Sequence, residues 1–125
     1  MSSEVLHVPR ERLSKQTLHL HYAIASLMEE LEAVDWYDQR VAATTDDELR
    51  AVLAHNRDEE KEHAAMVLEW LRRQDPALDR NLRKYLFTDA PLQALIAAEK
   101  ATPPAPVAPG GHLGIGDLRR AANED

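Results

Sequence analysis

Glu60 and His63 are the residues whose types and spacing could hold a metal ion. They form a Glu-x-x-His pair in a segment with a helical pattern, and a spacing of three places both side chains on one face. There a carboxylate oxygen and an imidazole nitrogen can bind the same ion. Both residues interrupt an apolar stripe at steps of three and four, where an unpaired charge is costly. The pair therefore predicts a buried metal site that needs further ligands.

Glu30 is the second candidate ligand, on the inner stripe of an earlier helix, three residues after Leu27 and four before Val34. Di-metal carboxylate sites in helical bundles take one Glu from each of two helices and a Glu-x-x-His from each of two others. One chain supplies one of each, so a two-fold dimer would complete the site with Glu30, Glu60 and His63 from both copies. Four carboxylates would then balance two divalent ions. The alternative is that Glu60 and His63 belong to an unusually polar helix surface.

Further polar residues lie near Glu30 in the sequence. Glu29, Glu32 and Trp36 cluster on the helix face away from Glu30, at about 100° per residue. This acidic patch could attract cations and pass them inward, or it could be a solvated face with an interface tryptophan. Tyr37 could hydrogen-bond a metal ligand, or it could be a core tyrosine.

The composition excludes several classes of function. The 125 residues have a formal charge of −7, which argues against nucleic acid and anionic membrane surfaces as partners. Without cysteine, any metal must be bound by oxygen and imidazole, which suits iron, manganese or zinc. No run approaches the roughly twenty apolar residues that span a bilayer, and the N-terminus lacks the features of a signal peptide. We therefore expect a cytoplasmic protein.

The helical pattern predicts an all-α fold. The first long helix should start between Pro9 and Ser14 and run to about Arg40, and the second should run to about Arg73. Thr45 and Glu48 predict a capping box at the start of the second helix. Short helices should follow over 77–87 and 91–100. Two long helices joined by a short turn make an antiparallel hairpin, and two hairpins would dimerise into a four-helix bundle.

The sequence changes character after the fourth expected helix. We expect an N-terminal extension over 1–12, a helical domain over 13–100, a Pro/Gly-rich linker over 101–112 and a tail over 113–125. The tail carries Leu113, Ile115 and Leu118 among glycines. On a tether, these apolar side chains predict a peptide that docks into a groove on another protein.

Several segments closely resemble the encapsulated ferritins. They are residues 28–37 (MEELEAVDWY), 55–64 (HNRDEEKEHA), 69–73 (EWLRR) and 85–88 (YLFT). The tail segment 113–118 (LGIGDL) is similar to the peptide that targets cargo into encapsulin nanocompartments, although Asp117 stands where family tails commonly have Ser.

The resemblance implies a ferritin-like bundle built by dimers, five of which close into a ring-shaped homodecamer. It implies a di-iron ferroxidase centre at the dimer interface, with ligands at Glu30, Glu60 and His63 and with Tyr37 nearby. An outer metal site on the route of iron would map onto Glu29 and Glu32, with Trp36 beside it. The protein would oxidise Fe(II) with dioxygen, and the encapsulin shell, reached through Leu113, Ile115 and Leu118, would hold the mineral.

Two alternatives to this function stay open on the sequence. A non-catalytic metal-binding or adaptor protein would serve mainly as cargo recruited through the tail. A di-iron peroxidase or oxygen scavenger would use the same ligand set, because such enzymes also combine carboxylates with imidazole. Dioxygen and peroxide consumption would separate the three.

Overall fold

The protein is described by a computed structural model that covers residues 5–101, leaving 1–4 and 102–125 outside the described part. Every regular element in this range is helical, as predicted. The elements are the short 3₁₀ helix η2 (Arg10–Arg12) and the α-helices α1 (Lys15–Ala43), α2 (Asp47–Gln74), α3 (Pro76–Tyr85) and α4 (Leu92–Ala101). None of the described helices is both long and apolar enough to span a bilayer.

The chain divides into two compact units, one ending at Leu71 and one beginning at Arg72. The first unit holds η2, α1 and most of α2, and the second holds the end of α2 with α3 and α4. The expected helical domain over 13–100 stays a prediction, and the expected tail over 113–125 lies outside the described residues.

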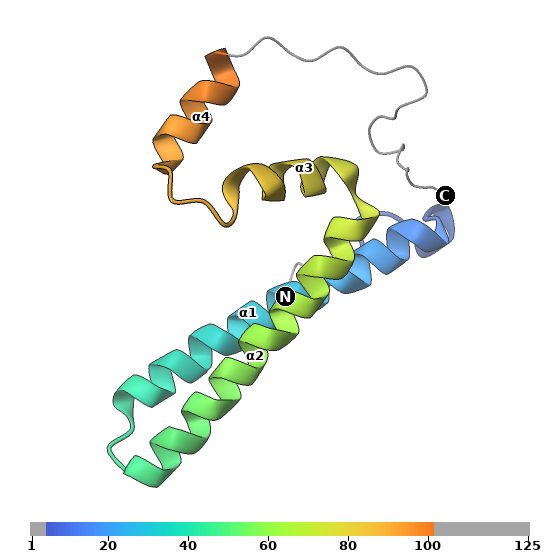
Figure 1. Cartoon of the computed structure of the whole chain (residues 1–125). Coiled ribbons are helices and arrows are strands. Elements are labelled where there is room, and N and C mark those ends of the chain that lie inside the picture. The colour runs from blue at the N-terminus through green and yellow to red at the C-terminus, as the bar shows by residue number, and fades with distance from the viewer. Residues whose placement is uncertain (1–4, 102–125) are drawn as a thin grey trace. The chain divides into compact units, whose positions relative to one another are not determined.

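In the first unit, α1 and α2 lie side by side and run in opposite directions (Figure 1). Ser14 begins α1, because its side chain accepts a hydrogen bond from the Thr17 amide at 3.0 Å. At the turn, the Asp46 carboxylate accepts a hydrogen bond from the Leu49 amide at 2.8 Å. The predicted capping box at Thr45 is therefore wrong: α2 begins one residue later, and Asp46 places a negative charge at the positive end of the helix.

A single hairpin buries little of its apolar surface. Among the described residues, only Ala64 and Leu71 are buried. The apolar stripe of α1 splits into two sets that alternate along the helix. Leu20, Leu27 and Val34 are half-buried, whereas Thr17, Ile24 and Leu31 are exposed. Half of the apolar stripe on α1 thus faces solvent in one chain. This is expected of a helix whose partner helix belongs to another chain.

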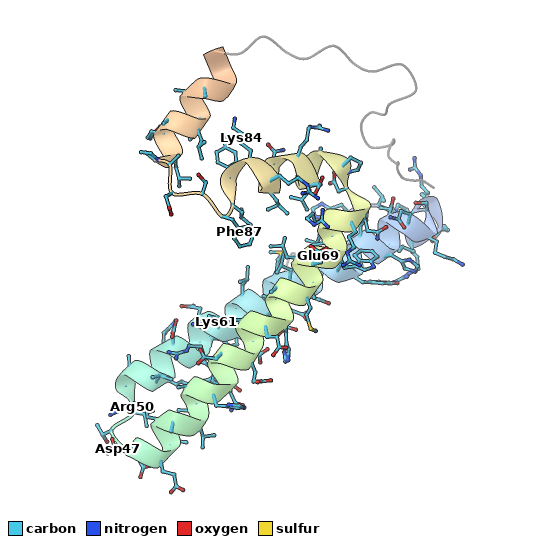
Figure 2. The ribbon with its side chains drawn as sticks, viewed as in Figure 1. Asp47, Arg50, Lys61, Glu69, Lys84 and Phe87 are labelled. Carbon is cyan, nitrogen blue, oxygen red and sulfur yellow. The ribbon has the colours of Figure 1, made fainter. Side chains whose placement is uncertain are left out.

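The second unit begins where α2 ends. Asp75 caps α3 by accepting hydrogen bonds from the amides of Ala77 and Leu78, and Pro76 occupies the first helical position. Asp79 on α3 binds both Arg72 and Arg83. After α3 the chain passes through Phe87 (Figure 2). The φ of this residue is 60°. A bulky side chain in this left-handed region costs about 1–3 kcal/mol.

Candidate metal centre

The three predicted ligands converge inside the first unit. His63 Nδ1 lies 3.2 Å from Glu60 Oε1 on the same helix and 3.6 Å from Glu30 Oε1 across the hairpin. One donor atom from each residue falls within 4.8 Å of the others, and no further set of three metal-binding side chains gathers in this way in the described range. Their role as metal ligands stays a prediction, but the geometry it requires is present within a single chain.

Helical spacing and hairpin pairing produce this convergence. The i, i+3 spacing places Glu60 and His63 on the face of α2 that meets α1. Glu30 comes from the facing helix and is half-buried, as are the other two residues. The His63 side chain keeps 43% of its surface exposed, so one side of the cluster is open. The open side leaves room for ligands from elsewhere.

The two carboxylates influence each other's protonation. A hydrogen bond between them, with burial and the charge of Glu60, raises the pKa of Glu30 above its ordinary value. The same hydrogen bond and the neighbouring His63 lower the pKa of Glu60. Of the two carboxylates, Glu30 therefore holds a proton more firmly than Glu60 does. The hydrogen bond that the His63 imidazolium donates to the Glu60 carboxylate raises the pKa of His63, because it stabilises the charged form.

The donor set fits a hard or borderline divalent metal. Two carboxylates and an imidazole, with no thiolate in the whole chain, suit iron, manganese or zinc. Three donors leave at least one coordination position open even in a four-coordinate site. The arrangement could therefore bind a divalent cation and still admit a small reactant such as dioxygen.

Arg57 links α1 to α2 near the cluster and was missed by sequence reasoning. Its Nη1 donates to Asp38 Oδ1 on α1 at 2.9 Å, and its Nε donates to Asp58 Oδ1 at 3.1 Å. The Arg57 side chain is only 23% exposed, and it precedes Glu60 by three residues, so it shares that face of α2. This ion pair ties the two helices together one helical turn from the carboxylates. The signal in the sequence was its i, i+3 spacing to Glu60.

The other predicted site residues do not join the cluster in one chain. Glu29 and Trp36 are exposed, and Glu32 is half-buried. Glu29 and Glu32 are not part of a group of three metal-binding side chains among the described residues. Tyr37 is half-buried, and the Arg40 guanidinium lies over its ring, 5.2 Å from the centroid. The proposed roles of these four residues stay predictions.

The chain is similar to several known proteins. The EncFtn-like family model matches residues 5–89. An encapsulated ferritin-like protein of Rhodospirillum rubrum is 55% identical over 129 residues, which cover 97% of this chain and 92% of that protein. A ferritin-like protein of Thermotoga maritima is 49% identical over 112 residues, covering 90% and 96%.

A third relative and a solved structure extend the comparison. An encapsulin nanocompartment cargo protein of Myxococcus xanthus is 37% identical over 100 residues, covering 73% of this chain and 77% of that protein. The crystal structure of a protein from Nitrosomonas europaea matches with a TM-score of 0.68 and 62% identity. It covers 70% of this chain and 96% of the solved one.

Proposed function

Because this chain belongs to the EncFtn-like family of encapsulated ferritin-like proteins, we propose that it is a ferroxidase that oxidises Fe(II) to Fe(III) with dioxygen. The observation that carries the proposal is the convergence of Glu30, Glu60 and His63. These residues are one Glu and one Glu-x-x-His, which is half of the ligand set of a di-iron carboxylate bundle. The reaction centre then requires a second copy of the chain.

A two-fold dimer completes the centre in this proposal. Each copy contributes Glu30, Glu60 and His63 through the open side of its cluster, and the four carboxylates balance two divalent ions. The exposed apolar residues Ile24 and Leu31 support such a dimer, because a partner helix would cover them. Five dimers closing into a ring-shaped decamer, as the family resemblance implies, is the larger assembly that we propose.

The protein's part in the reaction is to bind, balance charge and move protons. Iron is the substrate, and two Fe(II) ions held together can supply two electrons to dioxygen. The carboxylates of Glu30 and Glu60 favour the Fe(III) product, while the His63 imidazole maintains affinity for Fe(II). Cation binding favours the ionised carboxylates and therefore competes with protonation of Glu30, whose pKa is raised by its hydrogen bond with Glu60.

The surrounding residues take subsidiary roles in the proposal. Glu29 and Glu32 attract Fe(II) at an outer site beside Trp36, and Tyr37 lies near the centre. The tail docks the protein to an encapsulin shell through Leu113, Ile115 and Leu118, which lie outside the described residues. The shell lies in the cytoplasm, and the product mineralises inside the shell. The name of the Myxococcus xanthus relative, an encapsulin nanocompartment cargo protein, supports this destination.

Anaerobic loading followed by dioxygen tests the activity. Fe(II) is titrated into the protein without oxygen, and dioxygen is then admitted while iron-oxo absorbance and dioxygen consumption are followed together. We expect both to rise in proportion to bound iron. Metal binding without dioxygen uptake would favour a non-catalytic cargo adaptor, and peroxide consumption that outpaced dioxygen use would favour a peroxidase.

Native mass spectrometry with and without Fe(II) tests the shared centre. We expect iron to be bound by dimers or larger species. A protein that stayed monomeric with iron bound at full occupancy would contradict the proposal that the centre spans two chains.

A further inference from the structure

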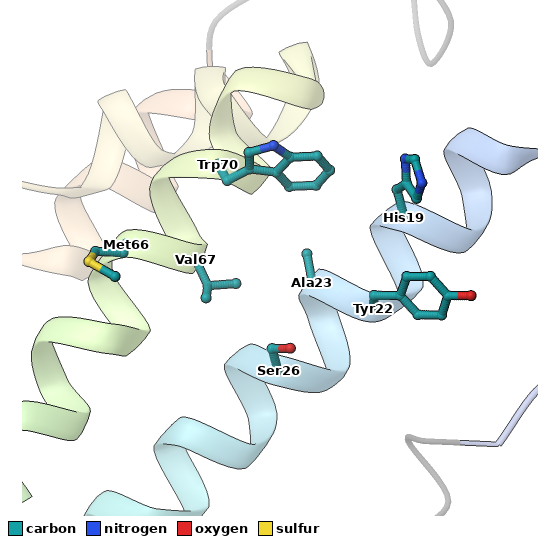
Figure 3. Close-up of a pocket in the computed structure, with 7 residues that line it drawn as sticks. All are labelled: His19, Tyr22, Ala23, Ser26, Met66, Val67 and Trp70. Carbon is teal, nitrogen blue, oxygen red and sulfur yellow. The ribbon is translucent and has the colours of Figure 1, made fainter.

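An apolar pocket lies beside the metal cluster in the first unit. It has a volume of about 380 Å³ and starts one helical turn beyond His63, at Val67. Trp70 and Val67 reach into it from α2, and Ala23 faces them from α1 (Figure 3). The remaining lining residues are His19, Tyr22, Ser26 and Met66. Tyr22, Met66 and Trp70 are all exposed, so two aromatic rings and one thioether face solvent outside the metal cluster.

Phe87 is an unusual feature of the second unit. Its side chain is fully exposed, at 103% of the reference surface, and its backbone is left-handed at φ 60°. Either property alone is unfavourable for phenylalanine. An exposed ring lacks the stabilisation that burial would give, and a left-handed backbone is crowded by the Cβ atom. Such outliers persist where a binding contact uses them. The chain therefore presents a phenyl ring to solvent on a strained loop.

We propose that Phe87 of one copy of this chain inserts into the pocket of a second copy. The pocket is large enough, because an apolar cavity of about 150 Å³ already holds benzene. Tyr22 and Trp70 offer ring edges and faces to the phenyl ring, and the Met66 thioether makes favourable contacts with aromatic rings. The pocket thus has room for the ring and a lining suited to it.

The charges of the two units support a contact between copies. Residues 5–71 carry fourteen acidic and seven basic side chains, so the unit that holds the pocket is strongly acidic. Residues 72–85, which lead to Phe87, carry five basic side chains (Arg72, Arg73, Arg80, Arg83 and Lys84) and only two acidic ones, Asp75 and Asp79. The segment that presents the ring is therefore attracted to the unit that holds the pocket.

This contact differs in symmetry from the proposed metal centre. A two-fold centre joins the same residues of both chains, whereas a ring in a pocket joins two different surfaces. A head-to-tail contact of this kind builds closed rings or open filaments, and combined with a two-fold contact it links dimers to one another. It uses none of Glu30, Glu60 and His63, so it stands whether or not the chain oxidises iron.

The absence of native cysteine allows a clean cross-linking test. One protein carries Ser26→Cys in the pocket, and a second, differently tagged protein carries Thr88→Cys beside Phe87. The two are mixed in metal-free buffer and oxidised gently. We expect a disulfide between the two tagged chains. A Thr45→Cys protein, which is exposed at the hairpin turn, replaces the pocket partner as the control and should cross-link little.

Phe87→Gly separates loss of binding from loss of folding. Glycine accepts the left-handed backbone without strain, so this variant should melt no lower than the parent. In the Thr88→Cys protein it should nevertheless weaken association at least about tenfold, as truncation of a buried aromatic anchor does. Leu92→Ala, which removes another exposed side chain of the second unit, should leave the cross-link unchanged. The proposal would be overturned if Phe87→Gly left the yield of the cross-link unchanged. It would also be overturned if the disulfide formed only within one chain that carries both cysteines.

Discussion

His63 on α2 lies with its Nδ1 atom 3.6 Å from Oε1 of Glu30 on α1, although the two residues are 33 positions apart in the sequence. This pair joins the two helices of the hairpin at the level of Glu60, which contacts the same imidazole from its own helix. The proposed metal half-site therefore depends on the pairing of the two helices. Anything that shifts α1 against α2 should change metal binding before it unfolds the protein.

Removing one of the proposed ligands should weaken metal binding. We expect Glu60→Ala or His63→Ala to weaken binding of Fe(II) at least about tenfold, because even partners of metal ligands cost 10–100-fold when they are lost. Anaerobic isothermal titration calorimetry measures this. Glu62→Ala is the matched control, since Glu62 is an exposed acidic residue between the two ligands in the sequence. A Glu60→Ala protein that bound metal like the parent would refute the assignment.

Metal affinity should fall as the pH is lowered. The pKa of Glu30 is raised, chiefly by its hydrogen bond with Glu60, and the pKa of His63 is raised, chiefly by its hydrogen bond with Glu60. Both hold protons to higher pH than isolated side chains do, and a metal must displace those protons. For each displaced proton, the apparent dissociation constant should rise about tenfold per pH unit below the raised pKa.

Mn(II) is a suitable probe for this pH dependence. Calorimetry at each pH in two buffers of different ionisation enthalpy counts the protons released on binding. We expect net release near neutral pH, because His63 is still partly protonated there. Binding without proton release between about pH 5 and 8 would contradict the raised pKa of His63 and its place in the site.

Arg57 should position the ligands without touching the metal. Arg57→Gln breaks the ion pair to Asp38, so Glu60 should lose its fixed register against Glu30, and metal affinity should fall about 10–100-fold. Arg57→Lys, which retains a charge but not the paired geometry, should recover part of the loss. Arg50→Gln is the control, because Arg50 binds the Thr44 carbonyl at the hairpin turn instead. Equal affinity in Arg57→Gln and the parent would leave Arg57 without a positioning role.

The sequence predicted the helices because their signals are local. Apolar periodicity placed the two long helices within a few residues of α1 and α2, and the i, i+3 rule placed Glu60 and His63 together. Glu30 could be found as well, because the depth of a residue on an amphipathic helix follows from its position in the stripe. These inferences need no knowledge of how the helices are offset.

Features that depend on exact register or backbone angles were missed. The ion pair between Arg57 and Asp38 depends on the offset of α2 against α1, which periodicity does not fix. Thr45 and Asp46 are both good capping residues, and a shift of one residue decided between them. The left-handed Phe87 has no sequence signal at all, since phenylalanine is among the residues least expected there.

The cap at Asp75 should hold α3 together. Asp75→Ala removes the acceptor for the amides of Ala77 and Leu78 and should cost about 0.5–2 kcal/mol of local stability. Hydrogen exchange of α3, followed by mass spectrometry, should accelerate at these and the following amides. Asp46→Ala is the control, because it removes the corresponding cap of α2 and should leave α3 unchanged. Unaltered exchange in α3 would show that the cap contributes little.

Deleting residues 113–125 should separate delivery from chemistry. The three apolar side chains of this segment, Leu113, Ile115 and Leu118, each gain roughly 1.5–3 kcal/mol when fully buried, so their loss should abolish docking to an encapsulin shell. The Glu30, Glu60 and His63 cluster lies within the first unit, so Fe(II) oxidation should persist. Co-expression with a shell protein and measurement of the co-purified cargo test the first expectation. Deletion of 121–125 alone, which removes only the polar end, is the matched control and should load normally. Oxidation that vanished with the longer deletion would mean that the tail belongs to the reaction centre or its assembly.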